Sequence, residues 1–418
     1  MSALRRTLID WPVPTEASIV ELGQVAQVRS GYAFKSSEWS SSGIPVVKIA
    51  NVKSGRLEMA GCSFIPSDIA KEAGDFNLSA GDILIAMTGY IGDVARVLDT
   101  DLPVVLNQRV GKFILKDKTR LNDDYLFQFL RWSETRRAIE ALGYGSAQPN
   151  VSPSLIHGIE IPLPAIEEQR EIASILGALD DKIELNRRMN GTLEALAQAV
   201  FKEWFVEKAE EGWEETSLAA QVEVAKGLSY KGSGLADAGR PMHNLNSIYE
   251  FGRYKYEGIK WYTGEFKERH LCKAGDVIVA NTEQGFDHLL IGSAAIVPKR
   301  FGDEGLFTHH IYRVRPLPTS YLTNHFLYLL LSHPAVREQV QGYTNGTTVN
   351  SLAKEGLERP TFKLPPKALV EKFDAVVAPL FARQEANYEE TQTLTALRDT
   401  LLPKLMRGEV RVKVKQYT

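Results

Sequence analysis

The chain has 418 residues, 44% of them apolar and 24% charged, and its 49 basic and 52 acidic side chains give a formal net charge of -3. This composition is typical of folded globular domains, argues against a disordered or fibrous chain, and lacks the basic excess of an indiscriminate nucleic-acid binder. The length predicts two or three domains at roughly 150 residues each. Cys62 and Cys272 lack the spacing of a zinc site, and no apolar run has the length of a signal peptide or a membrane span. We therefore expect a protein of the reducing cytoplasm.

The first half of the chain predicts an N-terminal segment over residues 1–20 and a mixed α/β domain over residues 21–164. The run Ala80–Ala86 begins with a Gly-Asp turn and continues into apolar residues, which is typical of a buried strand. Farther along, Asp124–Leu142 has helical periodicity. Leu163-Pro164 then closes the domain, and a long helix is predicted over residues 165–205.

The second half repeats these signals in the same order, so the chain is internally duplicated. The matching stretches are Leu22–Gly31 with Leu218–Gly227, Ala80–Ala86 with Ala274–Ala280, and Leu163-Pro164 with Leu364-Pro365. We predict a second domain over residues 206–365 with a helical segment at Asn324–Gln341, a second long helix over 366–407, and a basic tail over 408–418.

Both long helices carry an apolar heptad stripe, which predicts that they pack along one another. The positions spaced by seven are Ile172, Leu179, Asn186, Leu193 and Val200 in the first helix, and Phe373, Leu380, Asn387, Leu394 and Leu401 in the second. The intervening contact positions are Ile175, Met189 and Leu196 in the first helix, and Val376, Leu397 and Leu405 in the second.

Asn186 and Asn387 occupy the middle of the two stripes. A buried asparagine fixes helix register because its amide needs a polar partner, and we expect that role for both residues. The alternative is that both interrupt an ordinary amphipathic helix on its exposed side. The stripes allow either a parallel or an antiparallel pair.

The sequence lacks the motifs of common catalytic sites. It has no phosphate-binding loop, no dinucleotide fingerprint, no nucleophile elbow, no zinc-protease motif and no Asn-Pro-Pro-Tyr of an amino-methyltransferase. Glu265-Phe-Lys267 and Asp180-Asp-Lys182 have the carboxylate and lysine spacing of metal-dependent nucleases but lack the preceding Pro-Asp. His309 and His310 would point apart on a strand, which argues against a metal site. We therefore expect no catalytic residues and no metal.

Polar and basic residues recur in loops at matching places of the two halves. Asn and Gln can pair with adenine, Arg with guanine, and Lys or Ser with phosphate, although the same residue types also occur in ordinary solvated turns. The predicted DNA-contacting residues of the first half are Lys48, Asn51, Lys53, Arg56, Asn107, Gln108, Arg109, Tyr144, Ser146, Gln148 and Asn150. Those of the second half are Asn244, Asn246, Arg253, Lys255, Lys260, His309, His310, Tyr343, Asn345, Thr347 and Asn350.

Taken together, the repeated frame, the two Ala-Gly-Asp turns, Leu106-Asn-Gln108, Ile161–Ile172 and Leu401–Glu409 resemble the DNA-specificity subunits of type I restriction-modification systems. The resemblance implies an α+β fold in which two tandem α/β target-recognition domains are separated by two long antiparallel coiled-coil helices with pseudo-two-fold symmetry. The second half departs from the pattern at Thr308-His309 and at Leu364–Glu371, so its loops are aligned less firmly.

The resemblance also implies the partners. Each domain would read one half of a bipartite site in double-stranded DNA. The helices would bind two methyltransferase subunits that methylate adenine at N6 with S-adenosylmethionine, and restriction subunits that use ATP and Mg would join. The subunit itself would bind no cofactor and no membrane.

Two further expectations concern the helices. From Ile172 to Val200 is 28 residues, or about 42 Å of helix, against about 34 to 36 Å between half-sites one duplex turn apart. The helix pair could therefore set the gap between half-sites. The rival interpretation is a coiled-coil adaptor whose globular domains bind peptide or glycan.

Overall fold

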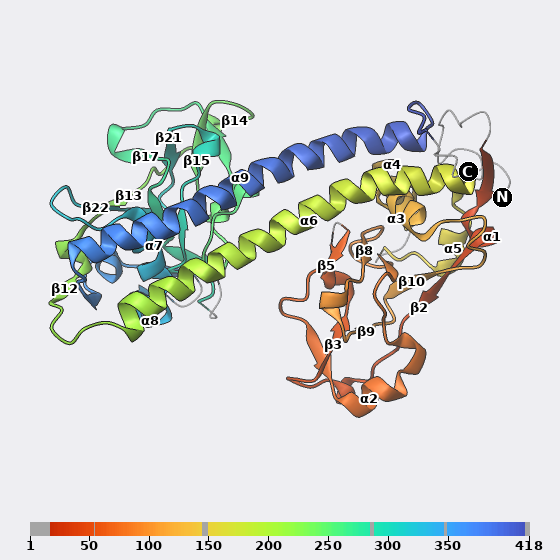
Figure 1. The fold of residues 1–418 in the computed structure, drawn as a ribbon, viewed down its shortest axis with the longest axis horizontal. Helices are drawn as coiled ribbons and strands as arrows, with labels where there is room; N and C mark the ends of the chain where they lie inside the picture. Colours follow the sequence, from red (N-terminus) through yellow and green to blue (C-terminus); the bar gives the residue numbers. More distant parts are fainter. Residues whose placement is uncertain (1–16, 54, 144–148, 285–287, 347–348, 414–418) are drawn as a thin grey trace. The chain divides into compact units, whose positions relative to one another are not determined.

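The computed structural model describes residues 17–53, 55–143, 149–284, 288–346 and 349–413 (Figure 1). The chain divides into two compact units: unit 1 comprises Met1–Ile183 with Gln392–Thr418, and unit 2 comprises Glu184–Thr391. Two long helices, α6 (Ile166–Lys202) and α9 (Lys367–Met406), contribute residues to both units. Each unit therefore combines one α/β domain with a segment of each helix. Among the described residues, every helix is too short or too polar to cross a membrane.

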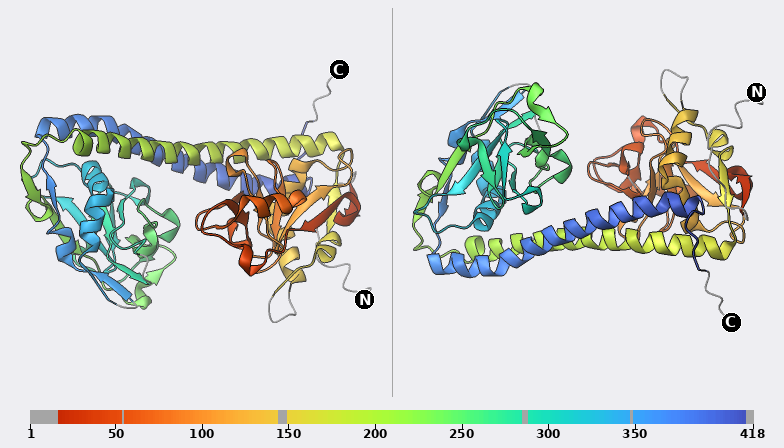
Figure 2. Two further views of the ribbon diagram at one scale, coloured as in Figure 1. Left: turned by 90° about the horizontal axis from the view of Figure 1, so that it is seen from below. Right: turned by 90° about the horizontal axis from the view of Figure 1, so that it is seen from above.

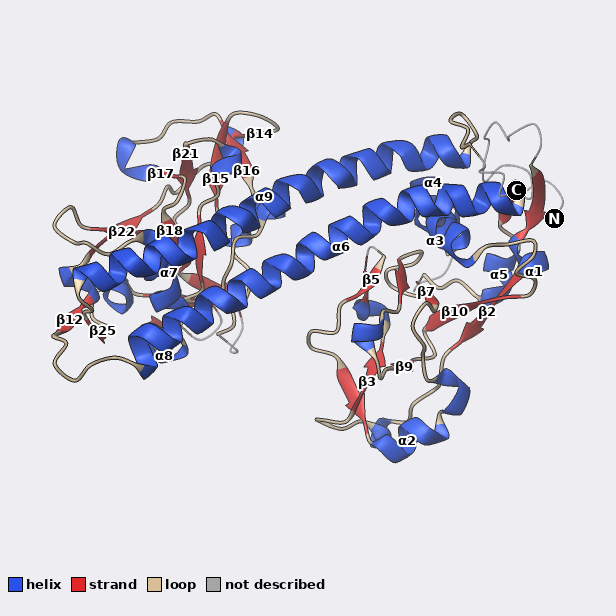
Figure 3. Cartoon of the chain, viewed as in Figure 1, coloured by secondary structure: helices blue, strands red, loops and turns tan. Residues whose placement is uncertain are grey.

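Domain 1, the part of unit 1 outside the two long helices, is built on an antiparallel sheet of order β2-β10-β7-β8 (Figure 3). Its strands are β1 (Ser18–Glu21), β2 (Ala26–Ser30), β3 (Ile44–Val47), β4 (Val52–Lys53), β5 (Arg56–Leu57), β6 (Ser63–Ile65), β7 (Ile83–Ala86), β8 (Val94–Arg96), β9 (Val105–Leu106), β10 (Val110–Leu115) and β11 (Glu160–Leu163). Its helices are α1 (Leu22–Val25), α2 (Ser67–Glu72), α3 (Asp123–Arg131), α4 (Ser133–Leu142) and α5 (Pro153–His157). β7 is apolar throughout because both faces of the sheet are covered there.

Domain 2, the corresponding part of unit 2, repeats this sheet with the order β13-β22-β18-β20. Its strands are β12 (Glu215–Ser217), β13 (Val222–Lys226), β14 (Leu235–Ala236), β15 (Arg240–His243), β16 (Lys260–Tyr262), β17 (Leu271–Lys273), β18 (Val277–Ala280), β19 (Thr282–Gln284), β20 (Ala294–Ile296), β21 (Glu304–Phe307), β22 (Ile311–Pro316), β23 (Thr344–Asn345), β24 (Val349–Leu352) and β25 (Thr361–Lys363). Its helices are α7 (Asn324–Ser332) and α8 (Pro334–Gln341). The matching strand orders confirm the duplicated fold predicted from the sequence.

Each predicted helical segment of the domains is a pair of helices rather than one. α3 and α4 are separated at Trp132, and α7 and α8 at His333, where the backbone is extended. Pro334 explains the second break, because the residue before a proline is disfavoured from helical geometry. The apolar pattern continues across each break because both short helices pack on the same core.

The long helices run antiparallel along one another within each unit (Figure 2). In unit 2, Asn190 donates to the carbonyl of Gln384 (3.1 Å), while Asn186, four residues earlier, donates to Glu390 (2.9 Å). In unit 1, the carboxylate of Asp180 binds Arg398. The residue number of the α9 partner falls as the residue number along α6 rises, so the two helices are antiparallel. The heptad stripes alone had left this direction open.

Four predicted contact positions of the heptad stripes lie instead on the exposed side of the helices. Ile175, Leu196, Val376 and Leu397 are 41%, 48%, 42% and 46% exposed. The helices also bury apolar residues against the domains: Ile172 of α6 packs in the core of unit 1, and Phe373 of α9 packs in the core of unit 2. One face of each helix packs on a domain and another face packs on the other helix. The seven-residue spacing by itself therefore could not show which apolar positions lie between the helices.

Candidate nucleic-acid interface

A cleft of about 510 Å³ in domain 1 gathers three of the predicted DNA-contacting residues. It lies where Thr88 follows β7, Gln108 and Arg109 precede β10, and Asn150 precedes α5. The backbone pairs Thr88 with Asn150, and the next residue, Val151, donates its amide to Met87 (2.9 Å). Gln108, Arg109 and Asn150 are exposed and line this cleft together, although they are distant in sequence.

Two glycines at matching places hold the turns that carry these residues. An added Cβ at Gly31 would lie 2.4 Å from the carbonyl oxygen of Leu106, and one at Gly227 would lie 2.3 Å from that of Phe307. Only glycine permits such close approach without a shift of the backbone. Residue 107 pairs with Tyr32 in domain 1 and Thr308 pairs with Leu228 in domain 2, so the two turns are equivalent.

His309 and His310 occupy in domain 2 the places of Gln108 and Arg109 in domain 1. Both lie in the turn that precedes β22, and their ring centroids are 3.8 Å apart with the planes at 41°. The expectation that adjacent residues would point apart was wrong because it assumed a strand. No group of three metal-ligating side chains occurs among the residues that the structure describes.

Several predicted residues of domain 1 surround the hairpin β4–β5. Lys48 donates to Ser63 (2.7 Å) and its Nζ lies 4.0 Å from the centroid of the Trp39 ring, while Nζ of Lys53 lies 3.9 Å from that of Tyr90. Arg56 pairs with Glu58 at 2.8 Å. Stacked on aromatic rings and half exposed, the two lysines keep a positive charge available at the surface.

Some predicted amides serve the fold itself. Asn51, 5% exposed, accepts from the amide of Lys48 (2.9 Å) and donates to the carbonyl of Glu58 (2.8 Å). Asn244, also 5% exposed, caps its turn by accepting from the amide of Asn246 (2.9 Å). Asn107 accepts from the amide of Arg109 at 3.3 Å and so shapes the turn at the cleft. We therefore leave Asn51 and Asn244 out of the proposed DNA-contacting set.

The remaining predicted residues of domain 2 fall into buried and exposed sets. Asn350 is buried on β24, and Tyr343 packs against the domain core. The amide of Leu352 bonds to Asn281 as that of Val151 bonds to Met87, which makes Ser351 rather than Asn350 the counterpart of Asn150. Asn246, Arg253 and Asn345 are exposed, and Lys255 and Lys260 are half-buried. Tyr144, Ser146, Gln148 and Thr347 lie outside the described residues.

The sequence reasoning missed Thr88, Thr282 and Lys226. Thr88 lines the domain 1 cleft, and Thr282 contacts the ring of His310 at 3.2 Å. Both follow the apolar run after the Gly-Asp turn, so aligning the two halves one step farther would have identified them. Burial, and then the nearby His309, Lys226 and Lys260, lower the pKa of His310 below the usual imidazole range.

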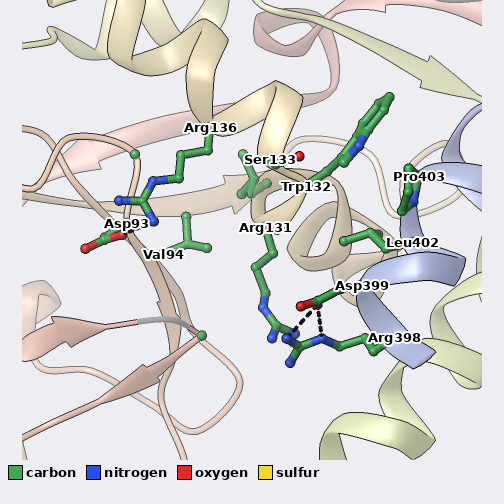
Figure 4. Close-up of a pocket in the computed structure, with 13 residues that line it drawn as sticks. Asp93, Val94, Arg131, Trp132, Ser133, Arg136, Arg398, Asp399, Leu402 and Pro403 are labelled. Atoms are coloured by element: carbon green, nitrogen blue, oxygen red, sulfur yellow. Dashed lines mark hydrogen bonds and ion pairs between the residues drawn. The ribbon is translucent and has the colours of Figure 1, made fainter. Parts of the chain in front are cut away.

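A second cavity of about 330 Å³ in unit 1 lies beside α3, α4 and the end of α9 (Figure 4). Arg131, Arg136 and Arg398 line it, but each is already paired: Arg136 with Asp93 (2.9 Å), and the other two with Asp180. Its guanidinium charges are therefore compensated inside the fold. Asp180 of the nuclease-like motif is likewise ion-paired with two arginines. We therefore interpret the charged residues of this cavity as structural and not as a candidate binding site.

Three comparisons place the chain among known proteins. The family model described as type I restriction modification DNA specificity domain matches residues 14–195 and 210–375. The specificity subunit of the MjaVIII type I restriction enzyme from Methanocaldococcus jannaschii is 32% identical over 186 residues, which are 44% of this chain and 44% of that protein. The MjaIX specificity subunit of the same organism is 27% identical over 80% of this chain and 78% of its own length. The crystal structure of a type I system S subunit from M. genitalium has the same fold, with a TM-score of 0.58 and 16% identity over 95% of this chain and 99% of that one.

Proposed function

The chain belongs to the family of type I restriction-modification DNA-specificity subunits, and from this premise we propose that it recognises a bipartite DNA target with one half-site per domain. The observation that carries the proposal is the difference between equivalent turns. The same backbone frame presents Gln108 and Arg109 in domain 1 and His309 and His310 in domain 2. Two domains of one geometry with different polar groups would read different base sequences. Family membership favours this function over the peptide- or glycan-binding adaptor.

The side chains around each turn suit the two tasks of a DNA-binding surface. Lys48 and Lys53 in domain 1 and Lys226 and Lys260 in domain 2 are cations that can contact phosphates, which position the protein on the duplex. Gln108, Arg109 and Asn150 carry the amide and guanidinium groups that read base edges in the major groove. The near-neutral net charge predicts that the isolated chain binds DNA weakly and that a partner strengthens the complex.

The exposed apolar residues of the long helices support the recruitment of partner subunits. Ile175 with Val376, and Leu196 with Leu397, stand 201 positions apart, the offset that relates Leu163 to Leu364, so both helices expose apolar side chains at the same two positions. Exposed apolar patches mark protein interfaces, and the recurrence of these side chains at equivalent positions is our reason to infer one on each helix. Two matching surfaces would bind two methyltransferase subunits, which would supply S-adenosylmethionine-dependent adenine methylation. Restriction subunits that use ATP and Mg would complete the system, while this chain directs them to the target.

The decisive experiment co-expresses the chain with its cognate methyltransferase in a host that lacks both, and maps N6-methyladenine by long-read sequencing. We expect one bipartite motif with a fixed unspecified gap, which disappears when this chain is omitted. Arg109→Ala should change the letters of one half only. Methylation without a bipartite motif, despite an assembled complex, would contradict the proposal.

Recruitment is tested separately with a helix variant. Leu196→Glu combined with Leu397→Glu should abolish co-purification of the methyltransferase while the melting temperature of the isolated chain stays unchanged. Leu185→Glu is the matched control, because Leu185 is 49% exposed but its counterpart is Ala386, so no large apolar side chain repeats at this position. Equal loss of binding in the control would contradict the two repeated docking surfaces.

A further inference from the structure

The hydrogen bonds of His309 and His310 determine which of their ring nitrogens carry protons. Nδ1 of His309 lies 3.4 Å from the carbonyl oxygen of Leu228. Because a carbonyl can only accept, Nδ1 of His309 is the protonated nitrogen. In the neutral ring its other nitrogen, Nε2, is then an acceptor.

Nδ1 is also the protonated nitrogen of His310, and here the hydroxyl of Thr282 determines it. Nδ1 of His310 lies 3.2 Å from the hydroxyl of Thr282, and that hydroxyl donates its single proton to the side-chain oxygen of Asn281 at 2.8 Å. The hydroxyl must therefore accept from Nδ1 of His310, which leaves Nε2 as the acceptor. The side-chain amide of Asn281 donates a hydrogen bond to the carbonyl oxygen of His309 at 3.0 Å, which orients its side-chain oxygen toward the hydroxyl of Thr282.

Both Nε2 atoms remain available to a ligand. Within the ranges that the structure describes, neither has a hydrogen-bond partner, and both rings are only half-buried. The neighbours that face His310 are His309, Lys226 on β13, Lys260 on β16 and Thr282 on β19, and no carboxylate is among them. Burial, and then these cations, lower the pKa of His310 below the usual imidazole range, which favours the neutral ring near pH 7.

The spacing of the two rings matches the spacing of stacked bases. Their centroids are 3.8 Å apart, close to the rise of about 3.4 Å between successive nucleotides of one strand. In the major groove the only hydrogen-bond donors are the exocyclic amines N6 of adenine and N4 of cytosine. Two rings at this spacing, each with an Nε2 that can accept, are therefore complementary to two successive amino bases.

We propose that His309 and His310 read the exocyclic amines of two successive bases, each adenine or cytosine, on one strand of the half-site bound by domain 2. This inference rests on the proposed function and adds the chemical class of the bases. Arg109, at the place of His310 in domain 1, offers only donors and would read guanine instead. The two domains thus share a backbone frame but differ in whether their side chains accept or donate hydrogen bonds at the bases.

The test exchanges the two side chains and reads the methylation motif of the complete complex. His310→Arg should change one position of the domain 2 half-site from adenine or cytosine to guanine, and Arg109→His should change one position of the domain 1 half-site from guanine to adenine or cytosine. Each variant should leave the other half-site unchanged, which shows that the complex is assembled. A wild-type complex without a bipartite motif would contradict the proposed function, whereas an intact motif whose letters do not change in these variants would overturn this inference alone.

A binding measurement on the wild-type complex provides the second test. Replacing the contacted adenine by purine, which lacks the N6 amine, should weaken binding of the target duplex by about 5- to 150-fold. Replacing guanine by 7-deazaguanine in the domain 2 half-site should leave the affinity unchanged. If purine substitution has no effect at any adenine of that half-site, and removal of the cytosine amine has none either, the inference is overturned.

Discussion

Domains 1 and 2 share a sheet order but contact the long helices through different polar groups. In unit 1, Asp180 of α6 lies between the guanidiniums of Arg131 and Arg398, and Gln128 also donates to it at 2.8 Å. In unit 2, the positions equivalent to Asp180, Arg131 and Arg398 carry Phe381, Ser332 and Ala197, respectively. The buried ion pairs of unit 1 therefore have no counterpart in unit 2.

Unit 2 has a polar contact of its own at another place. Glu194 of α6 accepts from the hydroxyl of Tyr328 at 2.8 Å and from the amide of Gln384 at 3.2 Å. The equivalent residues of unit 1 are Thr395, Phe127 and Ile183. The apolar and glycine positions repeat and build one frame twice, whereas these polar contacts between domain and long helices do not repeat. Each domain is therefore complementary to the helix segments of its own unit. If it packed on the equivalent segments of the other unit, charged side chains would lose their partners.

The largest effect is expected from breaking the unit 1 contact. Asp180→Ala would leave Arg131 and Arg398 largely buried without their shared carboxylate, and we expect unit 1 to lose about 3 kcal/mol of stability. Asp399→Ala is the matched control, because Asp399 is exposed and pairs with Arg398 at the surface, and its loss should cost less than about 0.5 kcal/mol. Calorimetry of the two variants checks the difference, and equal small effects would show that Asp180 is not needed for docking.

Acid should weaken the same contact. Burial raises the pKa of Asp180, but Arg131, together with hydrogen bonds from Gln128 and Arg398, lowers it more, so the pKa lies below the usual carboxyl range. A depressed pKa stabilises the fold above the unfolded value of about 3.9 and loses that contribution as the pH falls through the folded value. The difference in stability between wild type and Asp180→Ala should therefore shrink at acid pH.

The next effect compares the two glycines of the shared frame. Gly31→Ala and Gly227→Ala each place a Cβ against a backbone carbonyl, and we expect each to destabilise its own domain by about 1–3 kcal/mol. Gly191→Ala on the exposed side of α6 meets no atom within 4 Å and should instead stabilise by up to about 1 kcal/mol. Limited proteolysis identifies the domain that opens. Destabilisation of only one domain would show that the two turns are not equivalent.

The sequence predicted the features that repeat and missed those that depend on tertiary neighbours. The long helices, the duplicated sheets and the central asparagines follow from local patterns that occur twice. Periodicity could not show that Trp132 and His333 interrupt the short helices, because both flanking segments pack on one core. Nor could it show that Leu196 is exposed, since that depends on where the domain covers the helix.

The candidate site was predictable to a similar degree. The turns at Gln108 and His309 were found because the frame around them repeats. The buried roles of Asn51 and Asn244 were not visible, because an asparagine that caps a turn and one that reads a base occur in the same kind of loop. The adjacency of the two histidine rings depends on a turn that sequence reasoning had assigned to a strand.

A smaller effect should distinguish the two half-sites by pH. His310 must be neutral to accept from a base, and its pKa is lowered, so its discrimination is complete at neutral pH and declines as the pH falls through that lowered value. The equivalent turn of domain 1 presents Gln108 and Arg109 and carries no histidine. Competition binding with mismatches in each half-site, measured from neutral pH downward, should show discrimination falling several-fold in the domain 2 half only. A parallel fall in both halves would point to general acid effects on the complex.

The smallest effect is expected at the centre of the helix pair. Asn186 and Asn387 are 0% and 1% exposed, and their amides donate to Glu390 (2.9 Å) and Asn190 (2.8 Å). Replacing both by leucine exchanges hydrogen bonds for apolar burial, so the stability should change by less than about 1 kcal/mol in either direction.

The register should nevertheless become less strict, because leucines pair equally well one heptad away. A cysteine at 190 should cross-link to one at 384 in the native register, and to one at 391 only after a seven-residue slip. We expect the second cross-link as a minor product in the double-leucine variant and not in the wild-type background, since the docked domains still hold the helix ends. Its appearance in both backgrounds would show that the docked domains and the asparagines together do not fix the register.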